Sequence, residues 1–415
     1  MTTKAPLRRN RDFMLFQVGQ LLSTAGTQSA VIAYPLLVLA VTHSPAKAGI
    51  VSFARLLPQA AFGVVAGVAA DRWSRRRLMV SADSVRAVAV AGLAVAIVSG
   101  RVAWWQIPLV AFIDGSGATF FAAAQPGALR AVVPAPHLPA AVSVSSGREA
   151  AVRLAGPPLG GALFGLARSL PFFADAASYL FSFVSLIAMR TPFQETRERT
   201  PLRVREDIRE GLRFLWAHSF LRTTAFLYGL GNFIMPGVLL VLVVVGRRQG
   251  LSGGEVGALV AALGAAVLAG SLASAFLRRT LSIRTILLLE LWTWLGCWVF
   301  VAVPSVYALL AVVVPFGIAA PVTDSVVFGY RIAMTPDRLV GRVESVRRTI
   351  SLLIAPLGPL VAGFLLGIIS ARATIAVFAG FGLVLALWGT LSSAVRTAPS
   401  LDDLEGLAPA SAAIR

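Results

Sequence analysis

The chain has 415 residues, 57% of them hydrophobic and 13% charged, and its mean hydropathy is +0.79. A soluble fold could not bury that much apolar surface, so we interpret the chain as a polytopic membrane protein. The net charge of +18 lies in short arginine clusters between apolar runs, which excludes the continuous basic surface of a nucleic-acid-binding protein. One cysteine and three scattered histidines offer no disulfide framework or metal site, so no metal and no cofactor is expected.

Twelve apolar runs of about 20 residues, the length that crosses a bilayer, follow a polar segment at residues 1–12. The predicted spans are residues 13–42, 47–70, 78–100, 103–129, 140–167, 170–190, 223–246, 254–277, 283–303, 305–330, 342–369 and 372–395. The first run is too long for the core of a cleaved signal peptide. The sequence therefore predicts an all-α membrane protein with two six-helix bundles, at 13–190 and 223–395.

The two bundles are joined by a polar linker at 191–222. Within it, residues 203–216 place apolar side chains at helical spacing among arginines and glutamates, which predicts an amphipathic helix on the cytoplasmic surface. The tail at 396–415 consists of small and polar residues and is expected to be disordered.

Positive charge sets the predicted orientation, because lysine and arginine accumulate in cytoplasmic loops. Placing both termini in the cytoplasm puts most of the 37 lysines and arginines on that side. The opposite orientation would invert the ratio. We therefore expect a multi-pass protein of the cell membrane, plasma or inner, with both termini cytoplasmic.

Three short stretches recur in the same order in both halves, as in many transporters. The matching stretches are Arg75-Arg76 with Arg278-Arg279, Arg130–Pro134 with Arg331–Pro336, and Gly156–Gly161 with Ala355–Gly363. The second half lacks the acidic residue of the first, because Ser274 stands where Asp71 would be.

The turn after the second span carries a family resemblance. The run from Gly67 through Asp71-Arg72 to Arg75-Arg76-Arg77 resembles the loop 2-3 signature of the major facilitator superfamily. The twelve-span plan agrees with that family over nearly the whole chain. Three further runs, LPQAAFGVVAGVAADRWSRRRLMVSADSVRA, PGALRAVVP and PFFADAASYLFSF, resemble its enterobactin-exporter and macrolide-efflux branch. The resemblance implies two pseudo-symmetric six-helix bundles that work by alternating access.

The signature implies a conformational latch between the halves. Its small residues let another helix approach closely, and in the family that partner is span eleven. Asp71 would lie near a helix start around Gly341, where the positive dipole end favours a carboxylate, while its arginine neighbours pair with carboxylates such as Asp83. The arginines could also be positive-inside anchors. The predicted latch consists of Gly67, Asp71, Arg72, Arg75, Arg76, Asp83 and Arg86.

Span five contains a second motif, which resembles the core of the antiporter signature and implies an exporter. Consecutive prolines and glycines weaken the helical hydrogen bonds and bend the helix. The residues of this predicted kink are Gly156, Pro157, Gly160 and Gly161. A packing kink without meaning for direction is the alternative.

Charges inside apolar spans are costly and therefore tend to face a cavity or a partner. A carboxyl group in an apolar cavity can exchange protons at useful pH values. The candidates for proton coupling or the transport pathway are Asp114, Glu149, Arg153, Asp324 and Arg55. Glu149 and Arg153 can neutralise one another four residues apart, and the aspartates could instead form structural salt bridges. Many members of the resembling branch carry an acidic residue where this chain has Thr27. If that residue couples protons in them, coupling here must use another residue.

A substrate cavity between the halves would have mostly apolar walls with a few polar groups. Polar candidates lie in spans one and seven: Gln20, Thr27, Gln28, Tyr34, Tyr228 and Asn232. Hydrogen bonds that merely pack the helices are the alternative.

The sequence thus predicts a monomeric secondary transporter, not an enzyme, that exports small amphipathic molecules of the drug or macrolide type in exchange for protons. Its expected partners are the small-molecule substrate, the lipid bilayer and protons, without nucleic acid. A siderophore or secondary-metabolite exporter is an alternative prediction. A membrane receptor or scaffold without transport is the alternative from another class.

Overall fold

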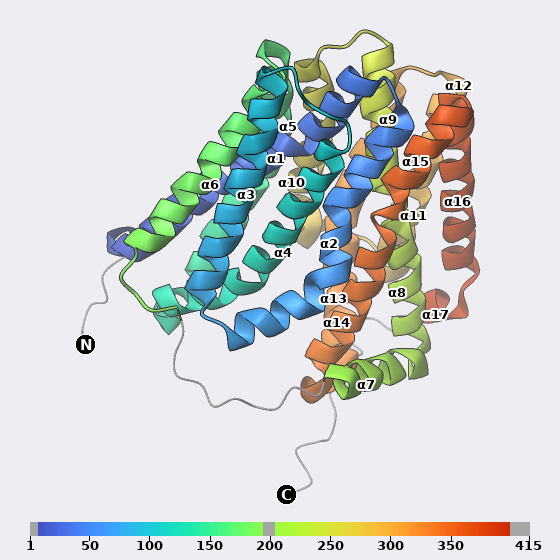
Figure 1. The fold of residues 1–415 in the computed structure, drawn as a ribbon. Helices are drawn as coiled ribbons and strands as arrows, with labels where there is room; N and C mark the ends of the chain where they lie inside the picture. The colour runs from blue at the N-terminus through green and yellow to red at the C-terminus, as the bar shows by residue number, and fades with distance from the viewer. Residues whose placement is uncertain (1–6, 194–203, 399–415) are drawn as a thin grey trace, which may run out of the picture. The chain divides into compact units, whose positions relative to one another are not determined.

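The computed structural model describes residues 7–193 and 204–398, which form α- and 3-10 helices and no strand (Figure 1). The α-helices are α1 (Arg11–Thr42), α2 (Pro45–Arg72), α3 (Arg75–Val98), α4 (Gln106–Val132), α5 (Leu138–Leu166), α6 (Leu170–Ala188), α7 (Val204–Ala217), α8 (Ser219–Gly231), α9 (Ile234–Arg248), α10 (Gly253–Thr280), α11 (Ile283–Trp292), α12 (Cys297–Ala302), α13 (Leu310–Met334), α14 (Asp337–Ile354), α15 (Leu357–Ile368), α16 (Ala371–Leu391) and α17 (Ser393–Arg396). Four 3-10 turns connect them, at Leu7–Arg9, Ala135–His137, Thr293–Gly296 and Val306–Leu309.

Eleven helical segments of the described residues are long and apolar enough to cross a membrane. This confirms the predicted all-α membrane fold. Helix α5 would be the twelfth span, and its 29 residues are enough to cross. It falls short in hydropathy because Arg148, Glu149 and Arg153 lie in its middle and two prolines follow them.

Three predicted spans are interrupted. Span seven breaks between α8 and α9 ahead of Pro236, and span eleven breaks between α14 and α15 at Pro356. Proline lacks the backbone N–H that would continue the hydrogen bonds of the helix, so a break on its N-terminal side is expected. Span nine passes through a 3-10 turn, Thr293–Gly296.

Serine side chains cap the helices that begin at the sharpest turns. Ser44 accepts a hydrogen bond from the Lys47 backbone N–H at the start of α2. Ser74 accepts one from the Arg77 N–H and so caps α3. The turn that resembles the family signature is therefore fixed by an ordinary N-cap where the family has glycine.

The helices group into two compact units. Unit 1 comprises described residues of 1–200, 239–261 and 359–368, and unit 2 comprises those of 201–238, 262–358 and 369–415. Unit 1 thus contains α1 to α6 together with most of α9, the first turns of α10 and most of α15. The predicted tail lies mostly outside the described residues, and the predicted amphipathic helix of the linker is present as α7 in unit 2.

Glycines allow the helices of unit 1 to approach one another closely. A methyl group on Gly160 of α5 would overlap the backbone of Ser29 in α1. A methyl group on Gly115 of α4 would overlap the backbone carbonyl of Arg55 in α2. Such backbone-to-backbone packing is the usual way in which membrane helices associate, and here it brings charged side chains of neighbouring helices into reach.

The Gly160→Ala substitution is expected to destabilise the folded protein by about 1 to 3 kcal/mol, because the added methyl group has no space against α1. Thermal unfolding of the purified protein measures the change. Gly165→Ala is the matched control in the same helix, since no atom lies within 4 Å of the position of its methyl group. Equal stability of the two variants would contradict the packing argument.

Candidate functional site

Five ionisable side chains lie together inside unit 1. We call Arg55, Asp83, Arg86, Asp114 and Asp175 the charged cluster. They come from α2, α3, α4 and α6. Arg86 is 3% exposed, Asp114 1% and Asp175 0%. Charged groups so far from solvent are found where partners or a function hold them.

Asp114 is the hub of the charged cluster. Its Oδ1 accepts hydrogen bonds from Arg86 Nε at 2.9 Å and from the Tyr179 hydroxyl at 2.8 Å. Its Oδ2 lies 3.5 Å from Arg55 Nε. This carboxylate therefore has two guanidinium partners and a hydroxyl donor, which favours its ionised form. The structure shows the ion pair with Arg55 that the sequence allowed as an alternative.

Arg86 links α3 to α1 and α6. Its Nη2 donates to the Tyr179 hydroxyl at 2.6 Å and to Thr27 Oγ1 at 3.0 Å, and its guanidinium lies 4.0 Å from the centre of the Tyr179 ring. Gly117 of α4 leaves the space that the aliphatic part of Arg86 fills. Thr27, a predicted cavity residue, is thus engaged by the charged cluster.

The remaining two carboxylates have fewer contacts. Neither oxygen of Asp83 or of Asp175 accepts a hydrogen bond from a described residue. Asp83 lies 3.7 Å from Arg86 Nη1, one turn away on α3. Asp175 is packed beneath Gly26 of α1, where any larger residue would collide with its Oδ1.

The predicted pairing of the turn arginines with Asp83 is wrong. Arg75 donates to the carbonyl oxygen of Phe193 at 3.3 Å, and Arg76 donates to those of Met189 and Thr191 at 2.5 and 3.0 Å. These carbonyl groups follow the end of α6, where a helix dipole attracts cations. Asp83 and Arg86 lie two and three turns further along α3 and belong to the charged cluster.

The predicted surroundings of Gly67 and Asp71 also need correction. No atom lies within 4 Å of a methyl group built on Gly67, so within unit 1 this position is open. Asp71 and Arg72 are exposed at the end of α2. Helix α14 begins at Asp337, because Pro336 precedes it, so Gly341 is in its second turn and is not a helix start.

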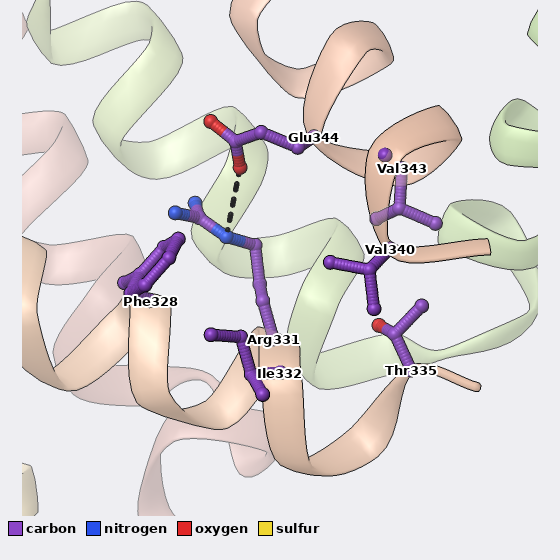
Figure 2. A pocket seen from close by; sticks show the side chains of 8 residues that line it. Phe328, Arg331, Ile332, Thr335, Val340, Val343 and Glu344 are labelled. Atoms are coloured by element: carbon purple, nitrogen blue, oxygen red, sulfur yellow. Dashed lines mark ion pairs between the residues drawn. The ribbon is translucent and has the colours of Figure 1, made fainter. Parts of the chain in front are cut away.

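Gly341 instead lines a pocket of about 160 Å³ between α13 and α14 (Figure 2). Figure 2 shows Arg331 of α13 and Glu344 of α14 pointing toward one another, with 3.2 Å between Arg331 Nε and Glu344 Oε2. Glu344 also pairs with Arg347 at 2.6 Å. This ion-pair network joins α13 to α14 beside the pocket.

The predicted pair between Glu149 and Arg153 is not formed. Glu149 lies 3.6 Å from Arg148 Nη2, and Arg148 donates from Nη1 to Gln17 Oε1 at 2.7 Å. Arg153 is exposed on α5. The hydrogen bond to Gln17 holds Arg148 against α1, and Glu149 turns toward this fixed charge, away from Arg153.

The predicted cavity residues of α1 lie along several faces. Gln20 is buried and donates to Ser182 Oγ at 3.4 Å, whereas Gln28 packs against Gly156 of α5. Tyr34 is 1% exposed, packs edge-on against Phe172, and its hydroxyl has no partner among the described residues. Gln20 and Gln28 therefore have packing contacts, which is the alternative role that the sequence allowed.

The remaining predicted site residues belong to unit 2. Tyr228 donates to the Leu287 carbonyl oxygen at 2.8 Å, and the exposed Asn232 donates to the Tyr228 carbonyl oxygen at 2.8 Å. Asp324 of α13 is exposed between the buried Thr323 and the half-buried Ser325. The structure does not bring these residues into the charged cluster.

Two glycine contacts in unit 1 join helices from opposite halves of the sequence. A methyl group on Gly49 of α2 would lie 2.6 Å from the Pro359 carbonyl oxygen of α15. A methyl group on Gly257 of α10 would overlap the Pro157 carbonyl of α5. We call these two contacts the glycine seams.

The seams are related by the internal repeat. Pro157 and Gly161 of α5 have the spacing of Pro359 and Gly363 of α15, and both glycines face the partner helix of their seam. The predicted kink thus has a packing role. The sequence did not identify Gly49 or Gly257, although each lies four residues after the first residue of its helix.

Tyr179 is the principal site residue that the sequence did not single out. It is fully buried and joins Asp114, Arg86 and Thr27, which lies 3.1 Å from its hydroxyl. Its only signal was its place in the run PFFADAASYLFSF, four residues after Asp175 and hence on the same helix face. In the described part of the chain, no group of three histidine, cysteine, aspartate or glutamate residues could hold a metal ion.

Comparison with known proteins gives a consistent family. The family described as transmembrane secretion effector, of the major facilitator type, matches residues 1–409. The multidrug efflux pump Tap of Mycolicibacterium fortuitum is 28% identical over 368 residues, covering 84% of this chain and 88% of that protein. Tap of Mycobacterium tuberculosis strain H37Rv is 28% identical over 367 residues, covering 83% of this chain and 84% of that protein.

Solved structures share the fold. A bacterial homologue of the human lysosomal transporter Spinster, inward-facing and unoccupied, superposes with a TM-score of 0.73 at 15% identity, covering 95% of this chain and 98% of that one. A bacterial homologue of the iron transporter ferroportin, inward-facing, superposes with a TM-score of 0.70 at 14% identity. The match covers 94% of this chain and 100% of that one.

The Asp114→Asn substitution is expected to cost about 3 to 5 kcal/mol of folding free energy, because it leaves two buried guanidinium groups without their carboxylate. Thermal unfolding in detergent measures the loss. Glu149→Gln is the control, since its side chain is 42% exposed and its loss should cost no more than about 1 kcal/mol. An Asp114→Asn variant as stable as this control would show that the hub is not structural.

Proposed function

Because the chain belongs to the major facilitator superfamily, in the family of transmembrane secretion effectors, we propose that it exports small amphipathic molecules in exchange for protons. The observation that carries this proposal is the charged cluster, which is buried in apolar helices and contains carboxylates in excess of arginines. A membrane protein that only packs its helices has no need of such a costly arrangement. The similar multidrug efflux pumps support export of the drug type.

Alternating access supplies the proposed mechanism. Backbone contacts through glycine, as in the two seams, close a helix pair without interlocking long side chains. Each seam joins one of the first six spans to one of the last six, so parting both seams would open the end of the protein where α2 begins. We place both termini in the cytoplasm of a cell-membrane protein, which makes this the outward end.

The latch completes the proposed cycle at the other end of α2. Asp71 is the single carboxylate in a turn that otherwise carries arginines, and the second half has Ser274 in its place. Arg75 and Arg76 fix the turn to the end of α6. The turn is thereby held rigid while Asp71 is exposed, as a residue that engages a moving partner needs to be.

Reconstituted protein should concentrate a fluorescent amphipathic cation or a macrolide when a pH difference is imposed across a liposome membrane. The coupling of substrate to protons is the physical reason, because the pH difference is then the only source of energy. Substrate accumulation is followed with and without the pH difference. Substrate movement that is the same with and without the pH difference would exclude proton exchange. Absence of any substrate movement would favour a receptor or scaffold.

The Asp71→Asn substitution should reduce this transport at least tenfold, an effect of about 1.4 kcal/mol, while membrane insertion stays normal. The reason is loss of the one acidic group of the latch. Transport rate in liposomes and protein yield in membranes are the two measurements. Arg77→Gln changes a charge in the same turn and is the control, and normal transport by Asp71→Asn would reduce the turn to a topology signal.

A further inference from the structure

The charges of the cluster do not balance. Arg55 and Arg86 supply two positive charges, whereas Asp83, Asp114 and Asp175 supply three negative charges when all are ionised. Two against three leaves one carboxylate without compensation. An isolated charge in an apolar interior is strongly disfavoured, and a carboxylate in that position is neutralised by a proton.

The contacts of the three carboxylates show which one has no arginine to compensate its charge. Asp114 has two arginine partners and the Tyr179 hydroxyl proton. Asp83 lies in ion-pair distance of Arg86. Asp175 is fully buried, its two oxygens accept no hydrogen bond from a described residue, and it forms no ion pair there.

The groups that face Asp175 come from four other helices. Tyr34 is contributed by α1, Arg55 by α2, Arg86 by α3, and Asp114 by α4, with Tyr179 on α6 itself. The Tyr34 hydroxyl is also buried without a partner among the described residues. Two neighbouring side chains thus have unused hydrogen-bonding capacity in the same part of unit 1, while every arginine of the cluster is engaged elsewhere.

We propose that Asp175 is the proton-binding residue of the transport cycle, and that the one proton held there is exchanged for one monovalent amphipathic cation. This inference rests on the proposed function, proton-driven export. In the exchange, the O–H bond of the Asp175 carboxyl group breaks and its proton passes to water. The cation then compensates the carboxylate, so the net charge of the cluster together with its ligand is the same before and after.

The position of Asp175 links proton release to a conformational change. Gly26 of α1 lies directly over the carboxyl group, close enough that an alanine methyl group would collide with Asp175 and with Ser178. The α1 side of the carboxyl group is therefore covered as long as this contact is closed. In the proposed cycle, water and substrate reach Asp175 when α1 and α6 part at this point.

Tetraphenylphosphonium is a suitable probe, because it is a monovalent amphipathic cation. Its binding to the wild-type protein in weakly buffered detergent solution should release about one proton per bound cation, seen with a pH indicator. Asp175→Asn should bind the cation more weakly than the wild type and should release no proton on binding. In liposomes this variant should still exchange labelled for unlabelled cation, and it should lose accumulation driven by a pH difference.

Glu255→Gln is the matched control, because this exposed carboxylate in the first turn of α10 lies outside the charged cluster. Proton release that persists in Glu255→Gln and is lost in Asp175→Asn supports the assignment. Release that persists in Asp175→Asn overturns it. If the wild-type protein moves no cation in response to a pH difference, the proposed function itself fails, whatever the variants do.

A second measurement decides the matter if Asp175→Asn does not fold. The infrared difference spectrum of the wild-type protein upon cation binding should show loss of the carbonyl band of a protonated carboxyl group. Asp83→Glu keeps the charge count of the cluster, and the band should stay at the same frequency in it. Absence of the band in the wild-type protein, or a shift of the band in Asp83→Glu, would overturn the proposal.

Discussion

The ion pair between Asp114 and Arg86 is the interaction on which the site depends. It joins α4 to α3, and through Tyr179 and Thr27 the same guanidinium group holds α6 and α1. Arg55 adds α2. Five membrane helices therefore converge on one buried carboxylate. The cost of burying these charges is offset only while all partners are present, so the helices keep their rotation and depth relative to one another.

The sequence was sufficient for the membrane fold and for the identity of several buried charges. Run length and composition predicted the spans because each helix must cross the bilayer on its own. Asp114 and Arg55 stood out because a charge in an apolar run is costly. The grouping was not predictable, because it depends on which helix faces meet. Arg86 follows the signature turn in sequence, and only the packing of α3 against α4 shows that it belongs to Asp114.

The close packing contact of α2 was predicted at the wrong residue, because it also depends on which helix faces meet. Gly67 has the spacing of a packing motif, yet the glycine of α2 that packs against another helix in unit 1 is Gly49, which meets α15. Spacing shows that a helix has a flat face, whereas the partner is set by tertiary structure. The repeat is the better guide, since it places Pro157 and Pro359 at equivalent positions and both seams then share one geometry. Two seams of similar geometry are suited to open and close together.

Thr27 sets the charge balance of the cluster. Its hydroxyl accepts a hydrogen bond from Arg86 and brings no charge, so the arginines of the cluster face three carboxylates. Many members of the resembling branch have an acidic residue at this position. Such a residue would leave two carboxylates in excess of the arginines. Arg86 would then be drawn toward α1, and its hold on Asp114 would weaken. The neutral threonine therefore lets Asp114 keep both arginines and leaves the cluster with a single carboxylate in excess, which is the role that we propose for Asp175 on α6.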